Sequence, residues 1–190
     1  MVELFPVSPL AFVRPGHFGA SGTGLTMREM TNLSLVSITA FSGEIGDLTE
    51  AVENLCGAGL PPPNRFISVG ALTLIASGPG QWMALSTAPN LIEMLQPLQS
   101  HAALTDQSHG RAIVRISGSK CNETLRKGVS LNLHEFAVGH AAVTVISHIG
   151  ALIWREADQD FVLAVPRSLA QSFWHWLETS AAEFGLEVEP

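Results

Sequence analysis

The alternation of apolar and polar positions becomes regular near residue 33, where a strand and then a helix are predicted. In "LSLVSITAF", residues 33–41, two sets of side chains alternate, which is typical of a strand with one buried face. Apolar residues then recur at helical spacing from Ile45 to Leu55, and Gly57 is well placed to end that helix. The consecutive prolines of "AGLPPPNR" exclude both helix and central strand, so a loop is predicted next.

Two further strands and a helix complete this first series. The strands are predicted over residues 71–77 and 81–86, with the turn "GPGQ" between them. A helix is predicted from about Asn90, with apolar residues on one side and Pro97 weakening its end.

A second series of similar elements follows. It starts at "AALTDQ" and continues through "RAIVRISG" into a predicted helix over residues 119–127. Strands predicted over residues 143–148, 151–155 and 161–165 then lead to a final helix.

The two series indicate an internal duplication. Residues 36–43, "VSITAFSG", align with residues 111–118, "RAIVRISG", and residues 82–98 align with residues 161–177. We therefore predict an α+β fold of two strand-helix-strand-strand-helix units that share strands, as in the folate-binding-domain fold named below. The units form one domain over residues 32–190, with halves of about 32–100 and 101–190. Residues 1–31 are rich in Gly and Pro without a sustained apolar period, so they are predicted to form an extended arm.

The final helix lies within "SLAQSFWHWLETSAAEFG", residues 168–185, and carries two of the four tryptophans. At about 100° per residue, Trp174 and Trp176 fall at the two margins of an apolar stripe, and His175 lies on the opposite, polar side. This phase predicts an exposed His175 and no cofactor site on the helix. The margins pack either on this chain's own sheet or on another subunit. The predicted stripe consists of Leu169, Phe173, Leu177, Ala181 and Phe184.

Composition adds the expectation of a partner. The chain is 46% hydrophobic and only 14% charged, so few charges are available to solvate a large free surface. Its net charge of −7 argues against a protein that binds a nucleic-acid backbone. Five of the ten basic residues fall in one region, which is either a solvated helix face with a strand edge or a docking patch for an acidic partner. These five are Arg111, Arg115, Lys120, Arg126 and Lys127.

The sequence shows none of the motifs that would assign chemistry to the chain. The two cysteines, Cys56 and Cys121, are far apart and exclude a CxxC site, and the seven histidines show no paired ligand spacing. No glycine-rich phosphate loop is recognisable. We therefore predict no catalytic, cofactor-binding or metal-ligating residue in this chain. With no recognisable signal peptide and no long apolar run, a cytoplasmic location is expected.

An ordered set of segments resembles a known family. The segments are "SPLAF", "LTMREM", "GQWMAL", "TDQSHGRAIVRISGSKCNETLRKGVSLNLH" and "DFVLAVPRSLAQSFWHWLETSAAEFG". Together they resemble the gamma subunit of heterotetrameric sarcosine oxidase. That family is similar in fold to the folate-binding domain of the glycine cleavage T-protein, an aminomethyltransferase-like fold, which agrees with the duplication.

The resemblance extends to motifs of the wider folate-binding family. Asp106, Ser108 and Gly118, with the helix after Ser119, match an Asp-x-Ser turn that leads into a strand, a glycine and a helix. Catalytic members also carry a Gly-Gly-x-x-Asp-Asp type segment, to which "HIGALIWREADQDF" corresponds here. Gly150 matches, but residues 151–154 are apolar and cannot exchange a proton. No folate chemistry is expected in this chain.

What the resemblance implies is a noncatalytic structural or docking subunit. The family's assembly oxidatively demethylates sarcosine to glycine, passes the one-carbon unit to tetrahydrofolate or releases formaldehyde, and forms hydrogen peroxide. FAD, FMN and the amine-oxidising site are implied for the beta subunit, NAD and tetrahydrofolate for alpha, and zinc for delta. The alternative is a free-standing folate or one-carbon-binding protein, or an enzyme, of the same fold.

Overall fold

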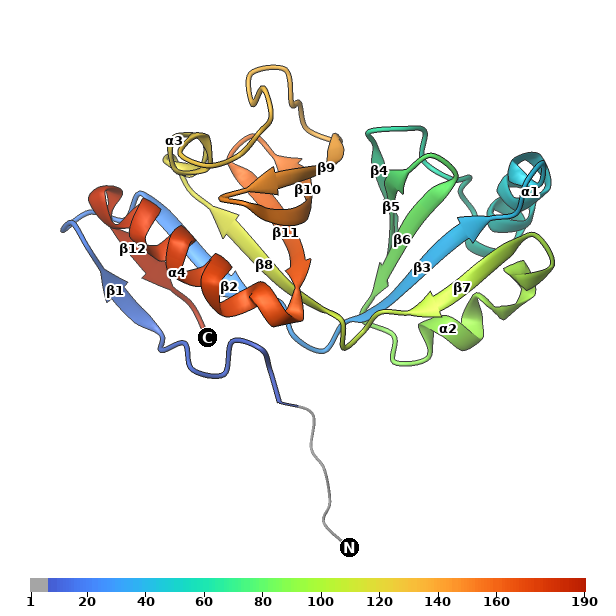
Figure 1. Ribbon diagram of the computed structural model, residues 1–190, viewed down its shortest axis with the longest axis horizontal. Coiled ribbons are helices and arrows are strands. Elements are labelled where there is room, and N and C mark those ends of the chain that lie inside the picture. Colours follow the sequence, from blue (N-terminus) through green and yellow to red (C-terminus); the bar gives the residue numbers. More distant parts are fainter. Residues whose placement is uncertain (1–6) are drawn as a thin grey trace, which may run out of the picture.

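Two β-sheets pack face to face, and helices cover the outer face of each (Figure 1). The structure is a computed structural model and describes residues 7–190. The smaller sheet runs in the order β4-β5-β6-β3-β7, entirely antiparallel. Its strands are β3 (Ser34–Ala40), β4 (Phe66–Val69), β5 (Leu72–Gly78), β6 (Gln81–Ser86) and β7 (Ala102–Asp106).

The larger sheet runs in the order β1-β12-β2-β8-β11-β10-β9, and only β12 and β2 are parallel. Its strands are β1 (Gly16–Phe18), β2 (Leu25–Glu29), β8 (Arg111–Ser117), β9 (Ala141–Ile146), β10 (Ile149–Ala157), β11 (Asp160–Pro166) and β12 (Leu186–Val188).

Four α-helices and three short 3₁₀ helices complete the described chain. They are α1 (Ile45–Cys56), α2 (Leu91–Met94), α3 (Cys121–Arg126) and α4 (Ala170–Ala181), with η1 (Gln96–Ser100), η2 (Arg167–Leu169) and η3 (Ala182–Phe184). The predicted start and stop of α1 are confirmed, and Gly57 ends it in the left-handed conformation, with φ of 77°. The helix predicted from Asn90 is confirmed as α2, but it has only four residues. Pro97 has no backbone N–H to donate, so the chain continues as the 3₁₀ helix η1.

The predicted duplication is visible in the element order. β3 begins at residue 34 and β8 at residue 111, an offset of 77, while β6 begins at residue 81 and β11 at residue 160, an offset of 79. Each unit therefore repeats a strand, a helix, three strands and a second helix, one strand more between the helices than predicted. The α+β class and the likeness to the T-protein fold are confirmed by the structural comparisons given below.

The two units exchange their leading strands. β2 precedes the first unit but pairs with β8 of the second, and β7 precedes the second unit but pairs with β3 of the first. Both pairs are antiparallel. Since each unit borrows a strand from the chain segment before the other, the two sheets form one folded body. Residues 34–106 supply every strand of the smaller sheet, and residues 111–188 form the larger sheet together with β1 and β2.

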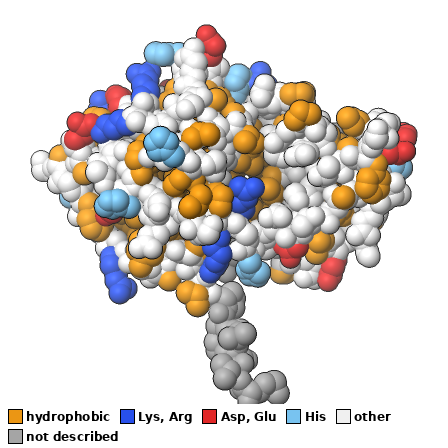
Figure 2. Space-filling view, viewed as in Figure 1, with side chains coloured by type: hydrophobic (Ala, Val, Ile, Leu, Met, Phe, Trp, Pro, Cys, Tyr) orange, Lys and Arg blue, Asp and Glu red, His pale blue; other side chains and the backbone are white. Residues whose placement is uncertain are grey.

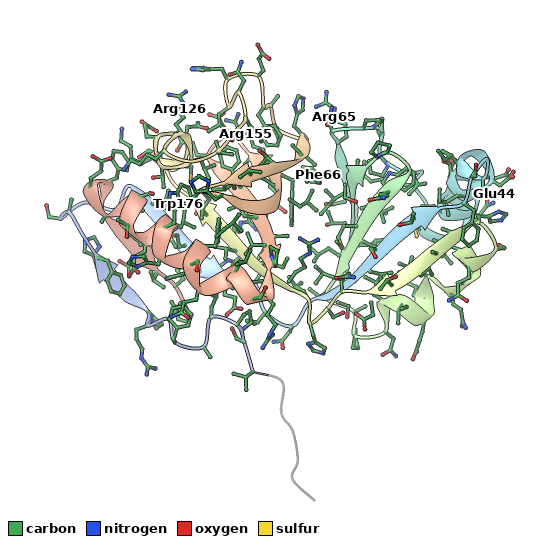
Figure 3. The ribbon with its side chains drawn as sticks, in the orientation of Figure 1. Glu44, Arg65, Phe66, Arg126, Arg155 and Trp176 are labelled. Atoms are coloured by element: carbon green, nitrogen blue, oxygen red, sulfur yellow. The ribbon has the colours of Figure 1, made fainter. Side chains whose placement is uncertain are left out.

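The core has three layers of apolar contacts. Cluster one lies between the larger sheet and α3 and α4, cluster two between the smaller sheet and α1 and α2, and cluster three between the sheets. The central cluster joins Leu35 and Met83 of the smaller sheet to Trp154 and Val162 of the larger one. Figure 3 shows Phe66 in the space between the sheets, where it packs against this cluster.

The expected N-terminal arm is wrong for residues 25–29. β2 is an inner strand of the larger sheet, with Leu25 and Met27 fully buried, and β1 adds a strand at the sheet edge beside β12. Residues 1–6 lie outside the described residues. The error has a physical cause: the partners of β2 are β8 and β12, which are distant in the sequence, so glycine-rich flanks conceal a strand that only tertiary pairing creates.

Candidate functional site

Helix α4 uses its aromatic residues mainly for the chain's own core. Phe173 and Leu177 are fully buried and Trp174 is 3% exposed, whereas His175 is exposed as predicted. Leu169 is 40% exposed and belongs to η2 rather than α4, so its predicted place in the stripe is wrong. The predicted phase holds within α4, because Phe173, Leu177 and Ala181 are buried, and Ala170 takes the first buried position.

Trp176 covers a glycine. A Cβ at Gly128, just after α3, would lie 2.6 Å from Cζ2 of the Trp176 ring. The partly buried indole packs against the cluster on the outer face of the larger sheet, and Figure 3 shows it projecting from α4. The sequence left open whether the two tryptophans pack on this chain's own sheet or on another subunit. In this structure both pack within the chain itself.

The Asp106–Ser108 turn is a structural joint between β7 and β8. The Ser108 hydroxyl donates to Asp106 Oδ1 over 2.6 Å, and the Ser108 amide donates to the same oxygen over 2.8 Å. These two hydrogen bonds lower the pKa of Asp106. Ser108 Oγ also accepts from the Leu35 amide over 3.0 Å, which fixes the turn against β3. The polar groups of this turn are thus engaged with one another and with the backbone.

The segment "HIGALIWREADQDF" forms β10 and the start of β11. Its apolar residues point into both core layers: Ala151 and Ile153 into the helix-covered cluster, Leu152 and Trp154 into the cluster between the sheets. They are buried packing residues and line none of the cavities described below. These four side chains therefore do not fit a folate site.

Arg155, on the same strand, is 7% exposed and has a structural task. Its guanidinium donates to the Phe136 carbonyl over 2.7 Å and to the Asp158 carboxylate over 2.6 Å, and lies 5.2 Å from the centre of the Phe161 ring. A buried charge with this many partners fixes the loop before β9 to the end of β10.

The basic region does not form one continuous patch. Arg115 donates to Asp160 over 2.9 Å and lies 3.2 Å from Glu156, while Lys120 pairs with Glu123 over 2.9 Å. Lys127 pairs with Glu183, and Arg126 contacts His134 over 2.9 Å. Among the five basic residues of this region, only Arg111 has no such partner within residues 7–190.

Arg111 lines a cavity of about 320 Å³ between the N-terminal segment, the β2–β3 connection and the start of β8. Arg167, Ser108 and His109 line the same cavity, together with Glu29 and the segment at residues 7–9. The sequence analysis did not single out Arg167. No local pattern links it to Arg111, because β8 and β11 bring the two residues together only through their register.

A second, more apolar cavity of about 460 Å³ lies between the start of α1, the proline loop and β9. Pro61, Pro79 and Trp82 form much of its wall, and Val143 lies at its mouth with 62% exposure. The Trp82 indole donates to the Pro61 carbonyl over 3.0 Å, so its one polar group is satisfied. This wall offers apolar contact and no acid or base.

A third feature joins Glu44, Asp47 and His101, whose potential ligand atoms all lie within 4.8 Å of one another. His101 Nδ1 is 2.9 Å from a Glu44 oxygen, and this contact links the start of α1 to the end of η1. Figure 3 shows Glu44 at the outer end of the smaller sheet. The three side chains are exposed or half-exposed and are explained as a surface ion pair with a neighbouring carboxylate. Sequence spacing missed them because the pair is 57 residues apart.

The two cysteines are free. Burial raises the pKa of the Cys121 thiol to about 12, and burial also raises the pKa of Cys56. Neither thiol is therefore set up as a thiolate nucleophile. Within residues 7–190, no helix combines the length and apolar character needed to cross a bilayer.

The fold is a duplicated α+β domain like that of an aminomethyltransferase. The glycine cleavage system aminomethyltransferase T from Bartonella henselae matches with a TM-score of 0.64 at 14% identity, over 87% of this chain and 48% of that protein. A heterotetrameric sarcosine oxidase from Corynebacterium sp. U-96 matches with a TM-score of 0.82 at 24% identity, over 94% of this chain and 96% of the matched chain.

Sequence comparison identifies the family. The sequence profile of the sarcosine oxidase gamma subunit family matches residues 47–183, so the chain belongs to that family. Sarcosine oxidase subunit gamma from Corynebacterium sp. strain U-96 is 26% identical over 186 residues, which cover 94% of this chain and 90% of the relative. The corresponding protein from strain P-1 is 29% identical over 182 residues, covering 89% and 86%. The resemblance found in the sequence is thereby confirmed.

Proposed function

We propose that this chain is a noncatalytic docking subunit of a heterotetrameric sarcosine oxidase. Its membership of the gamma subunit family carries the proposal, and the likeness covers nearly the whole chain and nearly the whole of its relatives. The family match favours this function over a free-standing folate or one-carbon-binding protein. The assembly converts sarcosine to glycine by oxidative demethylation, transfers the one-carbon unit to tetrahydrofolate or releases formaldehyde, and forms hydrogen peroxide.

The polar side chains of the described residues support a structural role. Asp106 and Ser108 bind each other, Arg155 holds a loop, and the "HIGALIWREADQDF" strand fills the core. We assign FAD, FMN, NAD, tetrahydrofolate and zinc to the partner subunits, here named alpha, beta and delta. Flavin chemistry is supplied by the cofactor, and a subunit without a means of holding one contributes by position. The free thiols suit a reducing cytoplasm.

The surface supports a docking function. Only 14% of the residues are charged, and a contiguous apolar patch on such a surface is typical of an interaction site. Figure 2 shows apolar side chains gathered near the middle of one face, with basic side chains among them. Among all the large apolar residues of the described chain, the five with the greatest exposure are Val7, Phe12, Ile45, Val138 and Val143.

Co-expression with the flavin-containing subunits tests the proposal. With an affinity tag on this chain, we expect the yellow flavin-containing subunits to co-purify, and the complex to consume oxygen when sarcosine is added. The chain purified alone should be colourless and consume no oxygen. Stoichiometric flavin, or sarcosine-dependent peroxide, from the isolated chain would contradict the proposal.

A tetrahydrofolate titration of the isolated chain separates the two functions. A docking subunit should show no saturable binding by calorimetry. Saturable binding, with no co-purification of partners, would instead support the free-standing folate-binding protein.

A further inference from the structure

Two arginines come together where the start of β8 meets the end of β11. Arg111 begins β8, and its partner in the register of β11 is Pro166, the residue before Arg167. The Arg167 amide donates to the Gly110 carbonyl over 2.9 Å, which fixes the two strand ends against each other. Both residues line the cavity of about 320 Å³ described above. The tertiary pairing therefore places two arginines in the wall of one cavity.

Neither arginine of this cavity is ion-paired within the described residues. Arg167 donates instead to the Val7 carbonyl. Glu29 is the one carboxylate in the cavity wall, and it accepts a hydrogen bond from the Ser8 hydroxyl. His109 and Asn32 line the same wall.

This arrangement is electrostatically incomplete. Two like charges in a partly enclosed site repel each other more strongly than they would in open water, because the nearby protein lowers the effective dielectric constant. A carboxylate between them would reverse the sign of that interaction and accept paired hydrogen bonds from a guanidinium fork. On a chain with a net charge of −7, such a positive site is also selective for acidic groups.

Exposed apolar residues in and near the cavity wall indicate that the acid belongs to a polypeptide. Val7 lines the cavity with 61% exposure, and its carbonyl accepts from Arg167. Leu169, two residues after Arg167 in the chain, is 40% exposed. A charged anchor with apolar neighbours is typical of a protein interface, whereas a small anion would leave those apolar side chains in water.

We propose that the Arg111–Arg167 cavity receives an acidic side chain or C-terminal carboxylate of a partner subunit, and that Val7 and Leu169 pack around it. This inference rests on the proposed docking function and adds the surface and the chemistry of the partner. Nothing covalent is involved, and the site acts as an electrostatic anchor for assembly.

Charge reversal of both arginines tests the site in the co-expressed complex. The variant carries Arg111→Glu and Arg167→Glu, and the matched control carries Arg65→Glu, an exposed arginine before β4 that lies away from the starts of β8 and α4 (Figure 3). We expect the double variant to recover at least about tenfold less flavin-containing subunit than the wild type. The control should recover the wild-type amount.

A neutral pair, Arg111→Gln with Arg167→Gln, separates lost assembly from lost folding. The neutral double variant should keep the thermal midpoint of the isolated chain, because removing two repelling charges relieves the free subunit. The neutral variant should weaken assembly less than the charge reversal. If both double variants fold normally and assemble as well as the wild type, the inference about the cavity is overturned. The proposed docking function is then unaffected.

Two other results also decide the matter. If the wild-type chain fails to recover any flavin-containing subunit, the docking function itself fails, and with it this inference. Succinate serves as the probe for a small-molecule site: saturable stabilisation of the isolated wild-type chain, absent from the charge-reversed variant, together with undiminished assembly would assign the cavity to a free carboxylate instead.

Discussion

The two units share the same arrangement of strands, but their helices differ in length and in how many residues they bury. In the first unit α1 has 12 residues and α2 has 4, while in the second α3 has 6 and α4 has 12. α1 buries only Leu48 and Val52, whereas α4 buries six residues that include two aromatic ones. The strand pairing of a duplicated fold can thus persist while the helical packing on each sheet is redistributed.

The alignment of the units shows how this difference arises. Residues 94, 95 and 98 of the first unit correspond to residues 173, 174 and 177 of the second. Leu95 and Leu98 are fully buried like their counterparts, but Met94 is 41% exposed where Phe173 is fully buried. Pro97 ends regular hydrogen bonding in the first unit, so the short helix cannot turn Met94 toward the sheet.

The largest expected effect comes from that mismatched pair. Phe173→Ala should reduce the free energy of unfolding by about 3–5 kcal/mol, because it leaves a cavity in the helix-covered core. Met94→Ala, at the aligned but exposed position, should change it by less than about 0.5 kcal/mol. Chemical denaturation of both variants measures the difference. Equal losses would show that the two helices bury their aligned residues alike.

A second test compares the glycines that follow the first strand of each unit. Gly43 and Gly118 both have positive φ, 86° and 124°, but only Gly118 is crowded: an added Cβ would lie 2.6 Å from the Gly24 carbonyl oxygen. Gly118→Ala should therefore cost about 2–4 kcal/mol through backbone strain and displacement of the chain before β2. Gly43→Ala, in open space, should cost only about 1 kcal/mol. Thermal unfolding of the two variants gives the comparison, and a milder Gly118→Ala would indicate that β2 can shift.

A third test examines the contact between the two helices of the second unit. Gly128→Ala places a methyl group against the Trp176 ring and should cost about 1–3 kcal/mol. Adding Trp176→Leu to Gly128→Ala should recover part of that loss, because the smaller side chain leaves room for the methyl group. A double-mutant cycle on the free energy of unfolding measures the coupling. Strictly additive losses would contradict the contact.

The smallest effect concerns the reactivity of the thiols on the first helix of each unit. Cys56, half-buried at the end of α1, should react slowly with a thiol reagent at pH 8, and Cys121, fully buried at the start of α3, should stay protected. The raised pKa of about 12 keeps Cys121 as the neutral thiol at that pH. Counting modified cysteines by mass spectrometry, native and in guanidinium, gives the result. Rapid native labelling of both would mean that α3 opens.

The sequence by itself determined the elements whose signals are local. The apolar spacing and Gly57 placed α1, the turn residues placed β5 and β6, and the repeated pattern identified the duplication. The ordered motifs identified the family, and the helical phase correctly predicted that His175 is exposed. Each of these features depends on residues that are close together in the sequence, or on similarity between two segments. Both kinds of information are present in the sequence itself.

Only the tertiary structure decided which distant strands pair. β2 looked like an arm because its burial is provided by β8 and β12, and the exchange of β2 and β7 leaves no local trace. The same register brings Arg111 beside Arg167, two residues that no spacing rule connects. Strand pairing takes its free energy from contacts across the sheet, so its partners, and the site they build, become visible only when the chain is folded.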